Sequence, residues 1–505
     1  MRNSRNLCFG ILALIFVSFN IVSGKEMNQD ELNSILRKAE ELYRAKEYDK
    51  AVEQYDLVLQ SIKDAGQLYN AACTYSLAGK LKKALSILNQ AVEAGWDAYD
   101  HMNRDPDLDN IRDEPEFKAL MGNLFKKIEE EEKKLKFWFN PGETLKVGEQ
   151  EYELVGRPAD TIPETARAVR DLHLFNEEIY LGYGDGMKNL GPVALISFQP
   201  DNEEWKYHFM LQEHLVTRFR QIGDELFIPG REPYEGIQGR TYIRNYDFGN
   251  IYRLFKHGGY AKYRTVPAAL HIQDIDELNG DFFCTAGTAN EGWIKNWGCI
   301  YQSKDGCVTW YPAYNLKTYE DTVARISLIR AFQGNLYAFS YAFNVTPDEK
   351  YLFYPDILGE KEAIVYDTKT WHTEDLIQNP GVLDVSHAEV FNKHLILNAR
   401  FYDPNSDSLP LEMVSRLYIY DGAGNARKTL DYPGLKIHDI FIADNGVYIL
   451  LQRDGKQEVL YSQDLVDFET LLYLPEELND VSCIAVYQKY LYFGTEEGMV
   501  YRIKL

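Results

Sequence analysis

The side chains that could do chemistry in this sequence are charged or imidazole-bearing residues that recur at one place in a repeated pattern. Each stands about nine to twelve residues before an apolar position in a strand-like segment. Arginine can hold a carboxylate, histidine can bind a metal or move a proton, and aspartate can accept hydrogen bonds or protons. We predict that these residues bind a ligand, and they are Arg170, Asp171, Arg218, His271, Asp274, Arg325, His387, His438 and Asp439.

Two sharper chemistries and one structural role are compatible with the same residues. His271, His387 and His438 come from different repeats and could converge on a metal, although no short spacing such as His-Glu-x-x-His supports this. Arg170, Arg218 and Arg325 could hold a substrate carboxylate. In the structural alternative, these side chains cap strands and bond one another across repeats. We assign no catalytic residue, metal ligand or cofactor.

The elements that must position these residues are seven similar hairpins after position 137. Each hairpin reads as alternating apolar residues, a tight turn such as Asn279-Gly280-Asp281, and alternating apolar residues again. The hairpins recur roughly every 50 residues, which leaves room for about four strands each. The second residue of each return strand is Tyr180, Phe227, Phe283, Tyr337, Ile396, Tyr448 and Tyr492.

This pattern predicts a seven-bladed β-propeller over residues 137–505. Its innermost strands converge on an axis, so the ionisable residues near their starts are expected in a polar funnel at the channel mouth. The last repeat has only three strand-like segments. We therefore expect the stretch Thr144–Val155 to supply its fourth strand and close the ring.

One turn in the third repeat carries a recognisable motif. Ser303, Asp305, Gly306, Thr309 and Trp310 resemble the Asp-box turn of sialidases and many other propellers, with the glycine displaced by one position. A more degenerate echo follows at 462–468. The resemblance implies a strand-connecting turn that lies far from any catalytic centre.

The segment before the propeller is expected to be helical. Small and apolar residues repeat there with an offset of 33, as in Ala39 and Ala72 or Ala51 and Ala84. This resembles tetratricopeptide repeats, although Lys46 stands where that family usually has glycine. We assign residues 25–125 to a tetratricopeptide-like helical domain and 126–136 to a charged helical linker.

The acidic stretch 105–116 could be misread as a calcium-binding EF-hand loop. Carboxylates fall at several ligand positions, but Asn110 replaces the glycine that the loop requires. Asp105-Pro106 and Glu114-Pro115 fit better as starts of short helices, because a capping acid followed by proline is typical there. We predict helix starts and no calcium site.

Composition and the N-terminus bear on partners and location. The chain has 505 residues and a formal net charge of −23, which disfavours nucleic acid and anionic membrane surfaces. Residues 1–24 have the basic, apolar and small-residue pattern of a signal peptide, so we expect a protein exported to the periplasm or exterior, without stable membrane insertion after cleavage. Cys284, Cys299 and Cys307 could form one disulfide or remain buried thiols.

The sequence therefore predicts an α plus all-β multidomain protein whose architecture is clearer than its activity. We expect a non-enzymatic binding or scaffold protein, in which the helical repeats recruit a protein or peptide and the propeller face binds a peptide, protein or glycan. The alternative is a sialidase-like glycan-processing or metal-assisted enzyme that uses the funnel.

Overall fold

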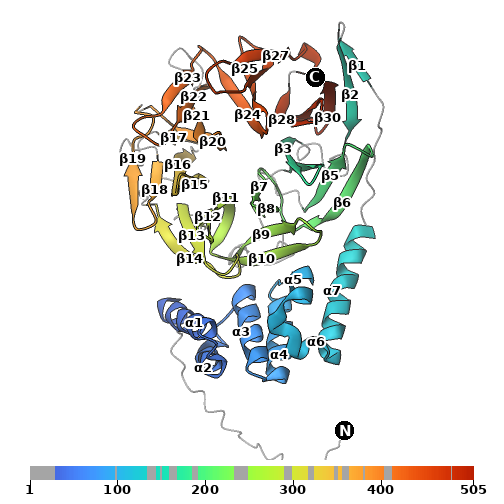
Figure 1. Cartoon of the computed structure of the whole chain (residues 1–505), viewed down its shortest axis with the longest axis vertical. Helices are drawn as coiled ribbons and strands as arrows, with labels where there is room; N and C mark the ends of the chain where they lie inside the picture. Colours follow the sequence, from blue (N-terminus) through green and yellow to red (C-terminus); the bar gives the residue numbers. More distant parts are fainter. Residues whose placement is uncertain are drawn as a thin grey trace, which may run out of the picture. The chain divides into compact units, whose positions relative to one another are not determined.

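The computed structural model describes residues 29–96, 99–133, 144–147, 150–157, 168–184, 192–231, 248–288, 298–316, 323–345, 351–354, 363–378, 381–402, 412–478 and 480–505. The proposed signal peptide and part of the charged linker lie outside these residues. The chain divides into two compact units, residues 1–61 and 62–505. Helices come first and strands follow, as the sequence predicts (Figure 1).

The first unit contains α1 (Gln29–Arg44) and α2 (Tyr48–Val58), which pack against each other through residues such as Ala39 and Ala51. The helices of the second unit are α3 (Ala65–Leu77), α4 (Leu81–Glu93), α5 (Tyr99–Arg104), the 3-10 turn η1 (Pro106–Leu108), α6 (Asp109–Arg112) and α7 (Pro115–Lys133). None of the described helices is long and apolar enough to cross a membrane.

The residues that follow two helices, 33 positions apart, have the same left-handed backbone conformation. Lys46 follows α1 with φ +60°, and Gly79 follows α3 with φ +73°. Each is the left-handed residue that turns the chain after a helix, a conformation that costs a non-glycine residue energy. The position where Lys46 departs from the family pattern is therefore one where glycine is favoured. The resemblance to tetratricopeptide repeats itself stays a prediction.

The acidic stretch contains helix starts, in agreement with the capping interpretation. The side chain of Asp105 accepts a hydrogen bond from the backbone of Asp107 at 3.0 Å and caps η1. Helix α7 then begins at Pro115.

Seven antiparallel sheets form a ring and confirm the predicted propeller (Figure 1). Blades 1 to 3 contain β3 (Val169–Phe175), β4 (Glu178–Tyr183), β5 (Val193–Gln199) and β6 (Glu204–Leu211); β7 (Arg220–Ile222), β8 (Glu225–Pro229), β9 (Phe248–Phe255) and β10 (Tyr260–Pro267); β11 (Ala269–Leu278), β12 (Asp281–Thr288), β13 (Gly298–Ser303) and β14 (Tyr311–Asn315). Blades 4 and 5 contain β15 (Val323–Phe332), β16 (Asn335–Val345), β17 (Tyr351–Tyr354), β18 (Ala363–Tyr366) and β19 (Trp371–Glu374); β20 (Asp384–Phe391), β21 (His394–Tyr402), β22 (Met413–Tyr420) and β23 (Arg427–Leu430). Blades 6 and 7 contain β24 (Lys436–Ala443), β25 (Gly446–Arg453), β26 (Lys456–Ser462) and β27 (Glu469–Tyr473); β28 (Val481–Tyr487), β29 (Tyr490–Thr495), β30 (Val500–Lys504), β2 (Gln150–Gly156) and β1 (Thr144–Val147).

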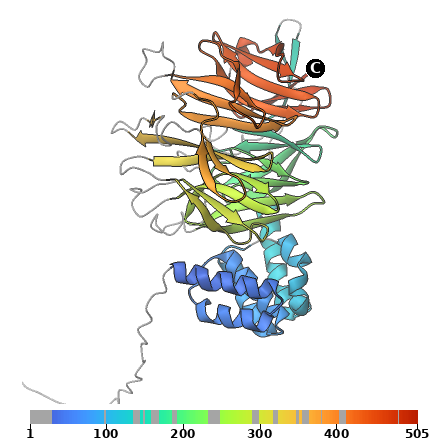
Figure 2. The same ribbon diagram turned by 60° about the vertical axis from the view of Figure 1, so that its left-hand side comes forward.

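The predicted hairpins are the first two strands of each blade. In blade 3, Leu278 pairs with Asp281, and the two turn residues Asn279 and Gly280 both have positive φ. This turn geometry matches the right-handed twist of the strands it joins. All seven apolar positions identified in the return strands are buried. The sheets stack face against face, and apolar side chains of neighbouring blades form the core between them (Figure 2).

The ring closes through an N-terminal strand, as the short last repeat predicts. Strand β2 pairs with β30 in blade 7, and β1 adds an outer strand that pairs with β2. Arg502 reinforces the closure, because its guanidinium donates to both carboxylate oxygens of Glu153 at 2.8 and 2.9 Å. Closure leaves fewer unpaired strand edges, which stabilises a sheet protein against mispairing.

Within the second unit, the helices contact the propeller. Helices α3 and α5 lie against β10, and α7 lies against β6. Trp96 is fully buried, stacks on Tyr69 at 4.2 Å and meets Tyr263 edge-on at 5.5 Å. Among the described residues, the cysteines are free and buried: Cys73, Cys284, Cys299, Cys307 and Cys483. The thiol interpretation of the blade 3 cysteines therefore holds in this structure.

Candidate functional site

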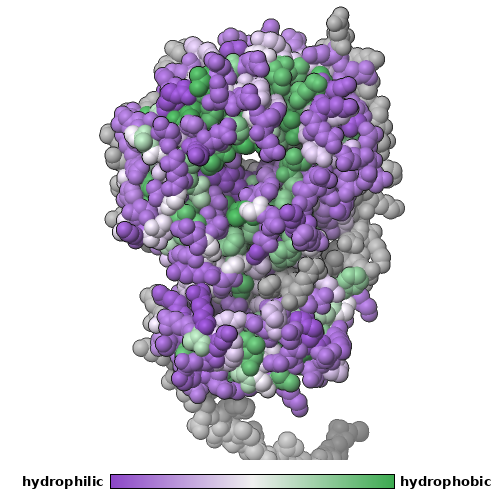
Figure 3. Space-filling view, in the orientation of Figure 1, coloured by the Kyte–Doolittle hydropathy of each residue, from purple (hydrophilic) through white to green (hydrophobic). Residues whose placement is uncertain are grey.

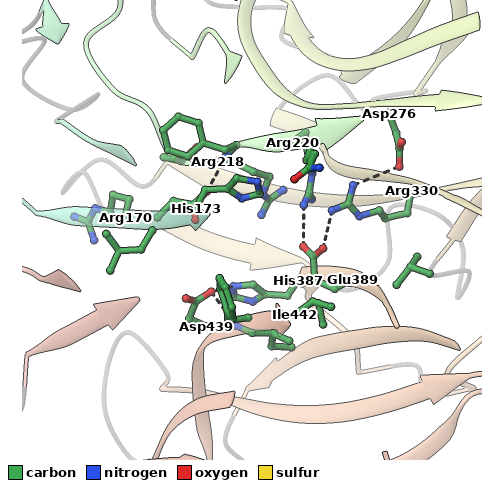
Figure 4. Close-up of a pocket in the computed structure, with 18 of the residues that line it drawn as sticks. Arg170, His173, Arg218, Arg220, Asp276, Arg330, His387, Glu389, Asp439 and Ile442 are labelled. Carbon is green, nitrogen blue, oxygen red and sulfur yellow. Dashed lines mark hydrogen bonds and ion pairs between the residues drawn. The ribbon is translucent and has the colours of Figure 1, made fainter. Parts of the chain in front are cut away.

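A cavity of about 430 Å³ lies at the centre of the ring, where the innermost strands converge. Figure 3 shows the ring face hollowed at this point, and Figure 4 shows side chains of several strands that point into the hollow. Five of the nine predicted residues line it. They are Arg170, Asp171, Arg218, His387 and Asp439.

Four of these five residues, all but Arg218, lie at a bulge in an innermost strand. The register of the first hairpin shifts between Val169 and Asp171 in blade 1, and equivalent shifts occur in blades 3 to 7. A β-bulge inserts one residue and redirects the side chains that follow it. The residues immediately after four of these bulges are Asp171, Asp274, His387 and Asp439.

The other four predicted residues do not line the cavity. Asp274 is fully buried behind it and is paired with arginine. The Nδ1 atom of His271 lies 2.6 Å from the carbonyl oxygen of Arg231. Arg325 is buried beside Gly287, and His438 is the bulged residue of β24.

Five further ionisable residues line the cavity that the sequence analysis did not identify. They are His173, Arg220, Asp276, Arg330 and Glu389. Four of them stand two residues after an identified residue: His173, Asp276 and Glu389 on the same strand as that residue, and Arg220 at the start of β7, two residues after Arg218. Strand side chains alternate between faces, so a period of two places both members of such a pair on one side. This alternation is the sequence signal that could have identified these residues.

An ion-pair network joins blades 2 to 5 across the cavity wall. Arg220 donates to both oxygens of Asp274 at 2.6 and 2.9 Å and to Glu389 at 2.8 Å. Arg330 donates to the other oxygen of Glu389 at 2.7 Å and lies 3.3 Å from Asp276 (Figure 4). Although burial acts in the opposite sense, the two arginines lower the pKa of Glu389, so this carboxylate is firmly ionised.

Arg218 is the exception within this network. Its side chain is 20% exposed, and its nearest partners are the Ser386 carbonyl at 3.2 Å, the Ser327 carbonyl at 3.4 Å and Asp274 at 3.4 Å. Both carboxylate oxygens of Asp274 already accept hydrogen bonds from Nε and Nη2 of Arg220. Burial lowers the pKa of Arg218 to about 10, and Asp274 only partly offsets that effect. Its guanidinium is charged at neutral pH but weakly compensated.

Three aspartates join neighbouring blades by accepting backbone hydrogen bonds. Asp171 accepts from the backbone N–H of Phe219 at 2.8 Å, and Asp439 accepts from that of Ile484 at 2.8 Å. Asp274 plays the same part between blades 3 and 4. The structural alternative raised from the sequence therefore holds for these three side chains.

The opposite side of the cavity holds two aspartates and a histidine with shifted pKa values. Burial, and then repulsion from Asp171, raises the pKa of Asp439 to about 8. Burial raises the pKa of Asp171 to about 6. Burial and the nearby Arg218 lower the pKa of His387 to about 3, and its Nε2 atom lies 3.7 Å from Asp439. At neutral pH this side presents a neutral imidazole, a largely protonated Asp439 and a largely ionised Asp171.

The three histidines considered as metal ligands do not come together. Among the described residues, the one group of potential ligand atoms gathered within 4.8 Å belongs to Cys73, Asp105 and Asp107, none of which lines this cavity. That group is accounted for locally, because Asp105 caps η1 and accepts a hydrogen bond from the hydroxyl of Tyr69.

The motif turn of blade 3 supports the fold and lies outside the cavity. Asp305 accepts hydrogen bonds from the backbone and hydroxyl of Thr309 and from the hydroxyl of Ser303. The side chain of Asn70 in α3 donates to Asp305 at 3.3 Å. The turn therefore also contacts a helix of the second unit. Its resemblance to the Asp-box stays a prediction.

Comparison with known proteins finds matches to the two parts of the chain separately. Residues 31–133 match the model of the A/B hydrolase-like N-terminal domain family, which leaves the propeller uncovered. Over 90 residues the chain is 29% identical to a chloroplastic protein of Arabidopsis thaliana. This match covers 17% of the present chain, and the chain spans only 27% of the length of that relative.

Solved structures resemble the propeller at low sequence identity. A polysaccharide lyase, ulvan lyase, has 12% identity, a TM-score of 0.41, and coverage of 68% of this chain and 94% of its own. Virginiamycin B lyase of Staphylococcus aureus has 11% identity, a TM-score of 0.39, and coverage of 67% and 95%. BamB of Moraxella catarrhalis has 11% identity, a TM-score of 0.35, and coverage of 72% and 96%. The seven blades rest on the strand pairing described above, independently of these similarities.

Proposed function

We propose that this protein is a non-enzymatic binding protein whose propeller holds a carboxylate group of its ligand in the central cavity. The observation that carries the proposal is the weakly compensated guanidinium of Arg218. A planar guanidinium binds a carboxylate through two parallel hydrogen bonds, which makes it the preferred side chain for such ligands. We propose a peptide or an acidic glycan as the ligand, since both carry accessible carboxylates.

The geometry of the charges around the cavity supports an anionic ligand. Arg218, Arg220 and Arg330 stand against the carboxylates of Asp274, Asp276 and Glu389, so the charges of this cluster balance. Arg220 holds Asp274 at 2.6 Å and Arg330 holds Glu389 at 2.7 Å, whereas Arg218 lies 3.4 Å from Asp274. A ligand carboxylate can therefore approach Arg218 more closely than the acids of the cavity do.

The enzymatic alternative has less support from the geometry. Of the three arginines that could hold a sialidase-type substrate, Arg325 does not line the cavity, and Arg170 lies at its rim, 42% exposed and paired with Glu496 at 2.8 Å. The three histidines are not gathered on one point. Arg218 remains as the anion-binding group, which is sufficient for binding without turnover.

Titration calorimetry on the full chain tests the proposal. The ligands are an oligoglutamate peptide, an oligouronate, their amidated or neutral counterparts, and inorganic phosphate. We expect one carboxylate class to bind, and Arg218→Met to weaken it by at least about tenfold, the loss of one charge-assisted pair. Arg416→Met is the matched control, because Arg416 pairs with Asp431 on the surface and lies outside the cavity. Binding that survives Arg218→Met unchanged refutes the proposal.

We also propose that the helices recruit a protein partner and that the mature chain is exported. Residues 1–61 form a unit of their own, so a chain that lacks residues 29–61 tests recruitment without disturbing the helices that contact the propeller. Affinity capture should lose a specific partner with that deletion. Cell fractionation and N-terminal sequencing should find an exported protein that starts at Lys25; a retained chain with its original N-terminus would contradict export.

A further inference from the structure

A second cavity, which we call the aromatic cleft, lies between the helices of the second unit and blades 1 and 2. It has a volume of about 570 Å³. Tyr99 of α5 and Phe125 of α7 line one side, and Tyr207 and Tyr260 of β6 and β10 line another. Cavities of a few hundred Å³ with mixed apolar and polar walls are the usual size for small ligands. Its lining residues are distinct from those of the central cavity.

Two pairs of aromatic rings line the walls of the cleft. Tyr99 and Phe125 lie 5.7 Å apart, and Phe125 remains 46% exposed at the edge. Tyr260 stacks on Phe209 with the ring centres 3.5 Å apart and the planes 11° apart. A large apolar ring left exposed beside a cavity loses little entropy when a ligand covers it, because the side chain has only two rotatable bonds.

The polar floor of the cleft is a preformed network with balanced charges. Glu178 accepts hydrogen bonds from Ser197 at 2.6 Å, from Gln199 at 2.8 Å and from Lys206 at 3.0 Å. His208 lies 2.8 Å from the hydroxyl of Ser197 and stacks with a neighbouring tyrosine. Burial lowers the pKa of His208, so the imidazole is neutral and the Glu178–Lys206 pair carries no net charge.

We propose that the aromatic cleft binds a neutral saccharide. A sugar ring has an apolar face of C–H groups, which an aromatic face covers well, and an edge of hydroxyl groups, which need fixed donors and acceptors. The cleft offers aromatic rings at Phe125 and Tyr207 and an ammonium and carboxylate at Lys206 and Glu178. An anionic sugar is disfavoured because Lys206 is already paired, and at the edge Lys256 lies 3.7 Å from Asp224.

This site is separate from the carboxylate site in the channel, and the two proposals can fail independently. The experiment uses the full chain with cellohexaose, xylohexaose, mannohexaose and maltohexaose, observed by saturation-transfer NMR and calorimetry. We expect at least one of them to bind. Phe125→Ala should weaken that binding about fivefold and Lys206→Met by a similar factor, because each removes one side of the sugar contact.

Two controls make the result specific. Tyr473→Ala removes an aromatic ring that is 60% exposed on β27, and Arg218→Met alters only the channel. Both should leave saccharide binding within twofold of the parent. The proposal is overturned if none of the four saccharides binds at millimolar concentration, if Phe125→Ala and Lys206→Met leave the affinity unchanged, or if binding depends on Arg218. Displacement of the bound saccharide by an apolar peptide would also overturn the proposal, because it would assign the cleft to a peptide.

Discussion

Replacement of Glu389 by glutamine should destabilise the propeller more than any exposed ion-pair mutation. Glu389 accepts one hydrogen bond from Arg220 at 2.8 Å and another from Arg330 at 2.7 Å. The side chains of the two arginines are 6% and 12% exposed. In Glu389→Gln, an amide group must face one guanidinium, donor against donor, and two buried cations lose their shared anion.

The magnitude follows from the partners that remain. Two charge-assisted hydrogen bonds are worth about 1.5–3 kcal/mol each, and breaking a buried pair costs about 3–5 kcal/mol. Arg220 keeps Asp274 and Arg330 keeps Asp276, so we expect a loss of about 3–4 kcal/mol in the free energy of unfolding. Urea denaturation followed by tryptophan fluorescence measures this difference.

The sign of the pH dependence gives a second check. Arg220 and Arg330 lower the pKa of Glu389 in the folded protein. The stabilisation is therefore present above its unfolded pKa of about 4.3 and is lost as the pH falls through the folded value. The difference between wild type and Glu389→Gln should be constant from pH 6 to 8 and should shrink in acid. Asp113→Asn, which breaks a surface pair with Lys118, should cost less than about 1 kcal/mol. If Glu389→Gln also lowers the free energy of unfolding by less than about 1 kcal/mol, the ion-pair network does not stabilise the propeller.

Three other predictions concern pH and backbone conformation. Because the pKa values of Asp171 and Asp439 are raised, the free energy of unfolding should fall as the pH rises from about 4 to 8, by about 3 kcal/mol for Asp171 alone. Urea denaturation at a series of pH values measures this fall, and Asp439→Asn should make it smaller. Gly66→Ala should lower the melting temperature, since a Cβ there would overlap a carbonyl oxygen of the propeller, whereas Gly122→Ala, with open space around it, should raise it slightly. Lys46→Gly should stabilise the first unit by about 1 kcal/mol, measured by thermal unfolding, because position 46 has positive φ.

The architecture could be predicted because each blade repeats local signals. Alternating apolar residues define the strands, and turn residues such as Asn279-Gly280 define the hairpins. The strand pairing within each blade could therefore be predicted with little information on contacts between distant residues. The missing strand of blade 7 could also be inferred, because a propeller must close. Position along the innermost strand then placed five of the nine residues at the cavity.

Part of the remaining information was in the spacing, and part was not. His271 and Arg325 stand twelve residues before their apolar positions, whereas the five cavity residues stand nine or ten before theirs, and neither His271 nor Arg325 lines the cavity. Whether a charge is free depends on distances between blades. Arg218 and Arg220 are two positions apart at the start of blade 2, but only the second is saturated by carboxylates from blades 3 and 5.

These distances divide the ring into two unequal parts. Blades 2 to 5 are joined by the network around Glu389. At the axis, Asp439 joins blade 6 to blade 7 and Asp171 joins blade 1 to blade 2, and the pKa values of both aspartates are raised. Blade 7 is closed by the β2–β30 pairing and the Arg502–Glu153 pair. Ionisation of both aspartates adds repulsion between them, whereas Glu389 in the network is already ionised.

The ring should therefore open first at blade 7 in alkaline conditions. Hydrogen exchange at pH 9, corrected for the intrinsic rate, should show lower protection in β28 and β30 than at pH 6, while β15 and β20 keep theirs, since local opening follows local stability. Asp439→Asn should restore protection in β28, because Asp439 faces the backbone of Ile484 there. Equal loss of protection in all seven blades would show that the ring opens as one unit and that the axial aspartates do not set its weakest point.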